Sequence, residues 1–162
     1  ITDDGQIDYS LTNKVPASLR QAIAEGKKIL VLMNPPYAES GDTLGSAAKT
    51  NVANTQIARN MSGYGYATRE LFVQFVARIA KEIPTATLAM FSTLKYVNSS
   101  NFEKFRNIWS AKYLDGFIIH SKAFDGLSGD FPIGFLIWNT QQNKKKKYEI
   151  CRRVSRNWQK LL

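Results

Sequence analysis

One short segment restricts the possible folds of this chain more than any other. Residues 29–33 form a continuous apolar run, and Asn34-Pro35-Pro36-Tyr37 follows at once. A strand that is apolar on both sides is typical of a parallel sheet, in which helices cover both faces. The two prolines end the run, because proline has no N–H to donate to a neighbouring strand. The segment therefore predicts a buried strand with a rigid polar turn at its carboxyl end.

Helical patterns occur on both sides of this run. Apolar side chains recur at helical spacing over residues 16–28 and again over residues 68–83. A capping-box pattern at Ser100 and Glu103 predicts the start of a third helix. The side chains expected to face the core from the last two helices include Phe75, Phe102, Phe105, Ile108 and Trp109. Gly63-Tyr64-Gly65, which follows no clear strand, is predicted to be a loop.

Three further apolar runs predict strands. They span residues 86–93, 114–120 and 131–140. Strands that alternate with helices indicate an α/β fold with a parallel sheet. Only about ten residues without a helical pattern join the last two strands, and a usual parallel crossover is longer. We therefore expect this last pair of strands to be antiparallel.

The charge of the chain favours a polyanionic partner. The chain has 22 lysine and arginine residues against 13 aspartate and glutamate residues, for a formal net charge of +9. Lys144, Lys145, Lys146 and Lys147 form an uninterrupted basic run, and residues 148–154 after it are a candidate fifth strand. This run is either a solvated loop face or a patch that contacts DNA phosphates. Contacts to phosphates give affinity without reading a sequence.

Cysteine usage and hydropathy exclude several classes of protein. The single cysteine, Cys151, excludes an intramolecular disulfide framework and a cysteine-rich zinc site, and we expect no metal. A reducing compartment suits such a chain, so we expect a cytoplasmic location. No apolar run approaches the ~20 residues of a membrane span. The first residues carry no signal-peptide pattern, and we expect no membrane partner.

The turn after the first apolar run carries the clearest chemistry. Ligands of open α/β sheets bind at the carboxyl ends of the strands. Asn34 supplies a side-chain carbonyl acceptor, while Pro35 and Pro36 fix the backbone so that a main-chain carbonyl can point into the cleft. Tyr37 adds an aromatic face on which a base can stack. Acceptors for both hydrogens of adenine's exocyclic amine favour a tetrahedral nitrogen, whose lone pair can then attack a methyl group.

These residues resemble a known family. Asn34-Pro35-Pro36-Tyr37 is similar to motif IV of the S-adenosylmethionine-dependent methyltransferases that modify amino groups. With the order of elements behind the motif, residues 29–140 look most like the DNA adenine-N6 methyltransferases of restriction–modification systems. The resemblance implies an α/β, Rossmann-like sheet that holds strands four to seven of the usual seven, the last of them antiparallel. It also implies double-stranded DNA as partner and S-adenosylmethionine as cofactor.

The same resemblance implies roles for individual residues. Asn34 and the Pro35 carbonyl would bind the target amine, and Asn34 is also the candidate contact to the cofactor. Tyr37 would stack on an adenine flipped out of the duplex, because an enzyme cannot reach a base inside the stack. Phe124 occupies the loop in which family members often have a second aromatic residue that contacts the base. The alternative for Phe124 is a side chain that plugs the core.

The chain departs from the family upstream of residue 29. A glycine-rich turn and an acidic residue for the ribose hydroxyls should precede motif IV, and neither is found there. We therefore expect residues 1–162 to form a single, partial methyltransferase domain that lacks the cofactor-binding half. The strand over residues 29–33 would then be an exposed apolar edge. Such an edge invites pairing with another chain, so we expect self-association.

Two other kinds of function fit the same residues. RNA guanine methyltransferases and release-factor glutamine methyltransferases also use an Asn-Pro-Pro-aromatic motif. An amide nitrogen, like the amine of adenine, has a delocalised lone pair that must be made available before it can attack a methyl group. The long polar stretch at residues 38–66 and the lysine run favour DNA over these substrates. The other alternative is a catalytically incomplete fragment that binds nucleic acid.

Overall fold

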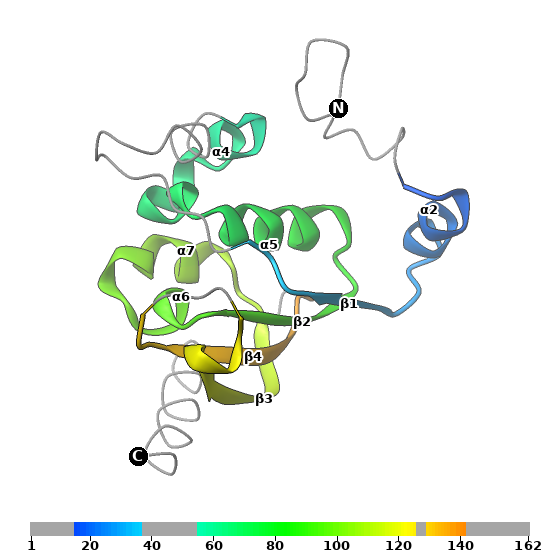
Figure 1. Cartoon of the computed structure of the whole chain (residues 1–162). Coiled ribbons are helices and arrows are strands. Elements are labelled where there is room, and N and C mark those ends of the chain that lie inside the picture. The colour runs from blue at the N-terminus through cyan, green and yellow to red at the C-terminus, as the bar shows by residue number, and fades with distance from the viewer. Residues whose placement is uncertain (1–14, 37–54, 126–128, 142–162) are drawn as a thin grey trace, which may run out of the picture.

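The computed structural model describes residues 15–36, 55–125 and 129–141 (Figure 1). Some candidate site residues lie outside these described residues, namely Tyr37 and Lys144 to Lys147. The elements follow one another as α2 (Ala17–Ala24), β1 (Ile29–Met33), α4 (Gln56–Asn60), the 3₁₀ segment η2 (Ser62–Arg69), α5 (Leu71–Glu82), β2 (Ala86–Thr93), α6 (Lys95–Asn98), η3 (Ser100–Phe102), α7 (Glu103–Ile108), β3 (Lys112–His120), η4 (Ser121–Ala123) and β4 (Pro132–Asn139).

The strands form one open, mixed sheet in the order β1-β2-β4-β3. β1 pairs in parallel with β2, whereas β4 runs antiparallel to both β2 and β3. β3 therefore points in the same direction as β1 and β2, and β4 is the reversed strand. The predicted α/β class and the predicted antiparallel pairing of the last two strands are both confirmed.

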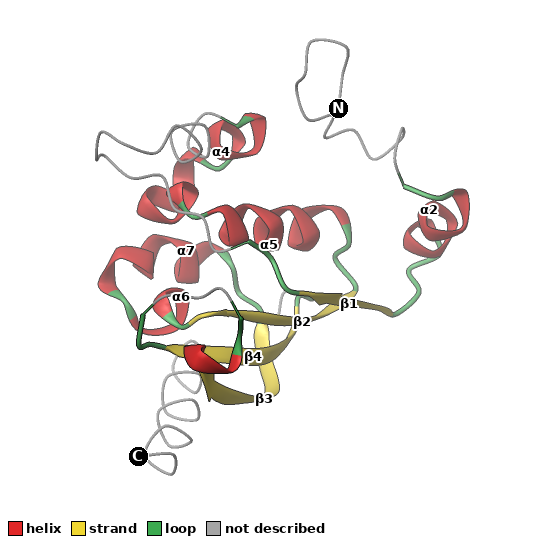
Figure 2. Cartoon of the chain, in the orientation of Figure 1, coloured by secondary structure: helices red, strands yellow, loops and turns green. Residues whose placement is uncertain are grey.

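The crossovers between the parallel strands place their helices on one side of the sheet. The chain passes from β1 to β2 through α4, η2 and α5, and from β2 to β3 through α6, η3 and α7. Figure 2 shows these helices together above the strands. Their apolar side chains meet those of the strands in a single buried cluster, which includes Phe72, Val76, Tyr96, Phe102, Phe105, Leu88, Met90, Leu136 and Trp138.

A buried hydrogen bond ties α6 to the sheet. The Trp138 indole Nε1 donates to the Tyr96 hydroxyl at 3.0 Å, and the two side chains are 2% and 1% exposed. A buried N–H group needs such an acceptor, because water cannot reach it. Burial raises the pKa of Tyr96 above its ordinary value, so the phenol stays neutral. The pair therefore fixes how the short helix after β2 sits over β4.

The opposite side of the sheet, here called the outer face, also carries apolar side chains. The Phe135 ring lies 4.7 Å from that of Phe91 and 5.2 Å from that of Phe117, measured between centroids. Leu30 and Leu32 of β1 lie on this face too, because Leu32 pairs with Ala89, two residues before Phe91. They are 68% and 69% exposed. The exposed apolar edge is therefore confirmed, and the prediction that residues 29–33 form a buried strand is wrong.

Glycines determine where two helical segments end or break. α2 ends at Ala24, inside the predicted range of residues 16–28, and Gly26, with a φ of 65° that a right-handed helix does not accommodate, is the stop that its place near the end of this range predicts. Gly63-Tyr64-Gly65 is part of η2 rather than a loop, and Gly65, with a φ of 66°, interrupts this 3₁₀ segment. A glycine at each of these positions avoids the steric penalty that other residues have at positive φ.

The third predicted helix is also divided and differently capped. Ser100 to Phe102 form η3, and Phe102 is the N-cap of α7 without a side-chain hydrogen bond, so the predicted capping box is wrong. Phe75 and Ile108 are 44% and 42% exposed, so their predicted core positions are wrong as well. The apolar stripes of α5 and α7 are wider than the part of each helix that contacts the sheet.

Candidate functional site at the carboxyl edge of the sheet

The three strands that share a direction end at the same edge of the sheet. Asn34 follows β1, Leu94 follows β2, and Ser121 follows β3, while β4 begins there at Pro132. The strands do not end at one level. The last residue of β1, Met33, pairs with Met90, so β2 continues by three residues, or about 10 Å, beyond it. The turn after β1 therefore lies in a step beside the longer β2.

This step holds the first three residues of the Asn-Pro-Pro-Tyr motif. Asn34 and Pro36 are exposed, whereas Pro35 between them is buried. Burial of Pro35 anchors the turn, and neither proline has an N–H that would occupy a nearby acceptor. The side-chain oxygen of Asn34 and the backbone oxygen of Pro35 are acceptors on the same rigid turn. The described part of the motif thus forms the turn at the carboxyl end of β1, and its role in binding stays a prediction.

Phe124 is brought to the strand next to this turn. It follows η4, is partly buried, and packs edge-on against Phe91 of β2, with the ring centroids 5.4 Å apart. Phe91 lies two residues before the end of β2, so Phe124 lies near the carboxyl edge on the outer face. This contact fits the packing alternative for Phe124. Part of the ring is exposed, so a contact between Phe124 and a base stays a prediction.

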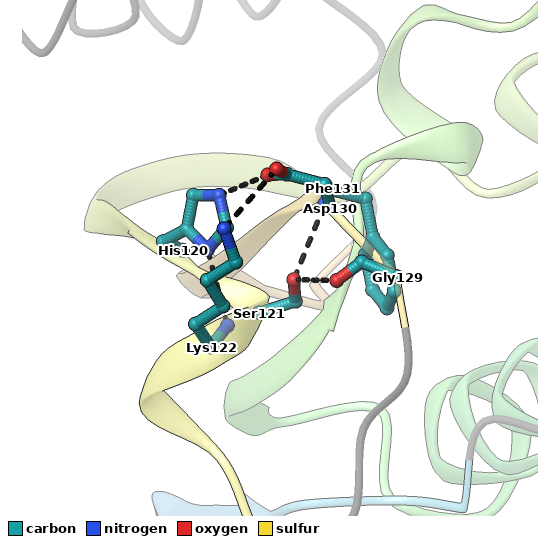
Figure 3. A network of polar contacts seen from close by, with 6 residues as sticks. All are labelled: His120, Ser121, Lys122, Gly129, Asp130 and Phe131. Atoms are coloured by element: carbon teal, nitrogen blue, oxygen red, sulfur yellow. Dashed lines mark hydrogen bonds and ion pairs between the residues drawn. The ribbon is translucent and has the colours of Figure 1, made fainter.

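A hydrogen-bonded frame holds the loop that carries Phe124 (Figure 3). The Ser121 hydroxyl donates to the Gly129 carbonyl at 2.8 Å and accepts from the Phe131 N–H at 3.2 Å. The Ser121 N–H also donates to the Phe131 carbonyl at 2.9 Å. Ser121 is fully buried, so these bonds are shielded from competing water. The two ends of the loop are therefore fixed to each other.

Charged side chains close the same frame on its exposed side. His120 Nδ1 accepts from the Lys122 N–H at 3.1 Å, and its Nε2 bonds the Asp130 carboxylate. Lys122 Nζ donates to the other Asp130 oxygen at 3.3 Å. With Nδ1 as acceptor, Nε2 is the ring nitrogen that donates to the carboxylate. The hydrogen bond from His120, and then that from Lys122, lower the pKa of Asp130.

Ser121 and Asp130 were not identified from the sequence. The signal available there is only a glycine and an aspartate just before a strand, which is common in turns. The contacts arise because β3 and β4 pair antiparallel, so that residues about ten positions apart face each other. His120 belongs to this frame as a structural residue rather than standing alone at the end of its strand.

A separate cavity of about 350 Å³ lies at the other end of the molecule. Its lining includes Trp109 and Ser110 just before β3, Thr140 just after β4, and the Arg78–Glu82 ion pair of α5. Because β3 begins and β4 ends here, the cavity is at the edge opposite Asn34. It shares no lining residue with the turn after β1, so the chemistry of that turn is not located in this cavity.

Two classes of site are absent from the described residues. Residues 15–36, 55–125 and 129–141 contain no group of three His, Cys, Asp or Glu side chains that could hold a metal ion. Within the same ranges, no helix is long and apolar enough to cross a membrane.

No protein-family model matches the sequence, and no curated protein matches it. The functional argument therefore depends on the fold and on the residues at the carboxyl edge. Together they define an α/β protein with an open mixed sheet, whose rigid Asn-Pro-Pro turn follows the edge strand.

Proposed function

We propose that this chain is the base-binding part of a Rossmann-like methyltransferase domain that methylates the exocyclic amine of adenine in DNA. One observation carries the proposal. Asn34-Pro35-Pro36 directly follows β1 at the carboxyl edge of a sheet in the order β1-β2-β4-β3, in which β4 is the antiparallel strand. The resemblance to the amino-group methyltransferases depends on the same residues and on the same order of strands.

The turn after β1 suits a planar amine. The Asn34 side-chain oxygen and the Pro35 backbone oxygen each accept one of its two hydrogens, and the buried Pro35 ring keeps the turn in place. Two accepted hydrogens pull the amine out of conjugation with the ring, so its lone pair becomes available to a methyl donor. Tyr37, the next residue, would then hold the base by stacking, for about 1–3 kcal/mol.

The described residues do not by themselves suit the methyl donor, S-adenosylmethionine. Their glycines with positive φ are Gly26, Gly65 and Gly129, and none of them directly follows a strand of the parallel set. Asp130, an acidic side chain at the carboxyl edge, already binds His120 and Lys122. We therefore propose that the described residues bind the amine and that polypeptide beyond them binds the donor.

Recognition of the amine can be tested without the donor. The probes are two duplexes that each contain one unpaired base, adenine in the first and purine, which lacks the amine, in the second. Two hydrogen bonds at about 0.5–1.5 kcal/mol each predict at least about fivefold tighter binding of the adenine duplex. Asn34→Ala removes one of the two bonds and should reduce the free energy of this preference by about half, while Asn60→Ala, an exposed amide on α4, should keep it. Equal affinity of the unaltered chain for both duplexes would refute the assignment.

The substrate class is tested by transfer of a labelled methyl group. This chain, and a longer protein that also contains the donor-binding half, are each incubated with labelled S-adenosylmethionine and with unmethylated genomic DNA, RNA or a protein extract, and the products are digested and separated by mass. With the donor-binding half present we expect label in N6-methyladenine from DNA, and none with Asn34→Ala. Label in guanine of RNA or in protein glutamine would replace DNA adenine as the substrate. Binding of the adenine duplex without transfer would identify a catalytically incomplete nucleic-acid-binding fragment.

A further inference from the structure

The outer face of the sheet presents an aromatic surface, made of Phe91, Phe117 and Phe135 on three neighbouring strands. Their rings contact one another at centroid distances of 4.7 to 6.3 Å, and Phe117 is 50% exposed. α5, α6 and α7 all pack on the other side of the sheet. Sheets of α/β proteins normally have a layer of helices on each face, because both faces are apolar. The aromatic surface therefore needs a cover.

The sequence after β4 has the pattern of such a cover. Residues 142–162 lie outside the described residues, so their pattern is read from the sequence. At 100° per residue, the apolar side chains from residue 148 onward fall on one side of a helix, namely Tyr148, Ile150, Cys151, Val154, Trp158, Leu161 and Leu162. The charged ones fall on the other side, namely Glu149, Arg152, Arg153, Arg156 and Lys160. This spacing is typical of a helix that packs on one face and is solvated on the other.

The segment is long enough to cover the surface. β4 spans eight residues, or about 26 Å, and residues 148–162 alone would give about 22 Å of helix. The intervening residues 142–147 can extend to about 20 Å, which is enough to reverse direction at the end of β4. A helix is also about 10 Å wide, which matches two to three strands spaced about 4.8 Å apart.

We propose that residues 148–162 form an amphipathic helix that covers the aromatic surface of the same chain. Its apolar side packs on Phe91, Phe117 and Phe135, and its basic side faces solvent. The segment is tethered to the end of β4, so it meets this surface at an effective concentration near the millimolar range. A second copy of the chain would have to offset the entropy of association. The proposal does not depend on methyl transfer, because it concerns only the packing of the chain.

The single cysteine provides a direct test. Cys151 lies on the apolar side of the pattern, so its reaction rate with an aromatic disulfide reagent reports whether this side is covered. In the full chain we expect the thiol to react at least about tenfold more slowly than in urea. Phe117→Asp, at an exposed position of the aromatic surface, should increase the native rate. The matched control is Phe75→Asp, an exposed phenylalanine on α5, which should leave the rate unchanged.

A second pair of variants tests the segment itself. Trp158→Glu places a charge on the apolar side and should expose Cys151, whereas Gln159→Glu, its neighbour on the polar side, should not. A native rate equal to the rate in urea, or equal effects within either pair, would overturn the proposal. Protection that disappears on dilution would also overturn it, because the cover would then be a second copy of the chain.

Discussion

Replacement of Tyr96 by phenylalanine tests how the helical layer is held to the sheet. The substitution keeps the ring and removes one oxygen, so it opens little space in the core. It leaves the Trp138 N–H without its acceptor, at a position only 2% exposed. An unsatisfied buried donor costs about 1–3 kcal/mol, so we expect a loss of about 2 kcal/mol in the free energy of unfolding.

The loss is measured by equilibrium unfolding in urea. Fluorescence of the buried Trp109 and Trp138 follows the transition, and a slope of about 2 kcal/mol/M converts the loss into a midpoint lower by about 1 M. In a thermal experiment the same loss lowers Tm by about 4–8 °C. Similar slopes for the variant and the unaltered chain would show that the stability itself has changed.

The matched control is Tyr64→Phe. Tyr64 is half-buried, and its hydroxyl has no hydrogen-bond partner among the described residues. Loss of that hydroxyl should change the free energy of unfolding by less than about 0.5 kcal/mol. If Tyr96→Phe destabilises the chain no more than Tyr64→Phe does, the Trp138 hydrogen bond does not stabilise the fold as argued.

Three further outcomes follow from the described contacts. Because burial raises the pKa of Tyr96, the unfolded chain loses this proton first, so stability present below about pH 10 should fall above it by up to about 1.4 kcal/mol per pH unit. Urea titrations at rising pH should show this component in the unaltered chain and not in Tyr96→Phe. Asp130→Asn removes the carboxylate bound to His120 and Lys122, so the amides of Lys122 and Phe131 should lose protection from hydrogen exchange. Relative to the intrinsic exchange rate at each pH, the unaltered chain should lose the same protection when the pH falls through the lowered pKa of Asp130. Leu30→Lys combined with Leu32→Lys places two cations on the outer face of β1, and light scattering should show less of the proposed self-association. The control, Gln21→Lys combined with Ala24→Lys, adds two cations on exposed α2 and should leave self-association unchanged.

Strands could be predicted from the sequence where a chemical boundary marks their ends. Residues 29–33 end at two prolines, and residues 86–93 begin after Pro84, so both match the observed strands. β3 starts at Lys112, two residues before the predicted start at residue 114. Its first residues are polar or irregular, with a register shift between Tyr113 and Asp115, so no apolar run marks them.

Short helices could not be predicted because they are stabilised by contacts between distant parts of the chain. α6 has only four residues, too few for a helical period to be visible. It is held by the bond between Tyr96 and Trp138, which lie 42 residues apart. The exposure of Phe75 and Ile108 has the same kind of cause, because only the assembled sheet determines how much of each apolar stripe is covered.

The same distinction between local sequence and contacts between distant residues applies to the candidate site. The position of Asn34 follows from local sequence, since a strand and the turn that ends it are adjacent in the chain. The frame around Ser121 and Asp130 depends on the pairing of β3 with β4, and therefore becomes visible only in three dimensions.

The arrangement of the sheet explains why the turn after β1 is well placed to bind a ligand and why the described residues enclose that ligand incompletely. β1 is the edge strand among those described, so the step that holds Asn34 has a wall on the β2 side and is open on the other. Among the described residues, a ligand held by Asn34 would therefore be contacted from the β2 side only. A strand paired with the free edge of β1 would supply the second wall and cover Leu30 and Leu32 at once. The edge that we expect to promote association and the open side of the candidate site are thus the same feature, so a partner that blocks the edge should also alter binding of the amine.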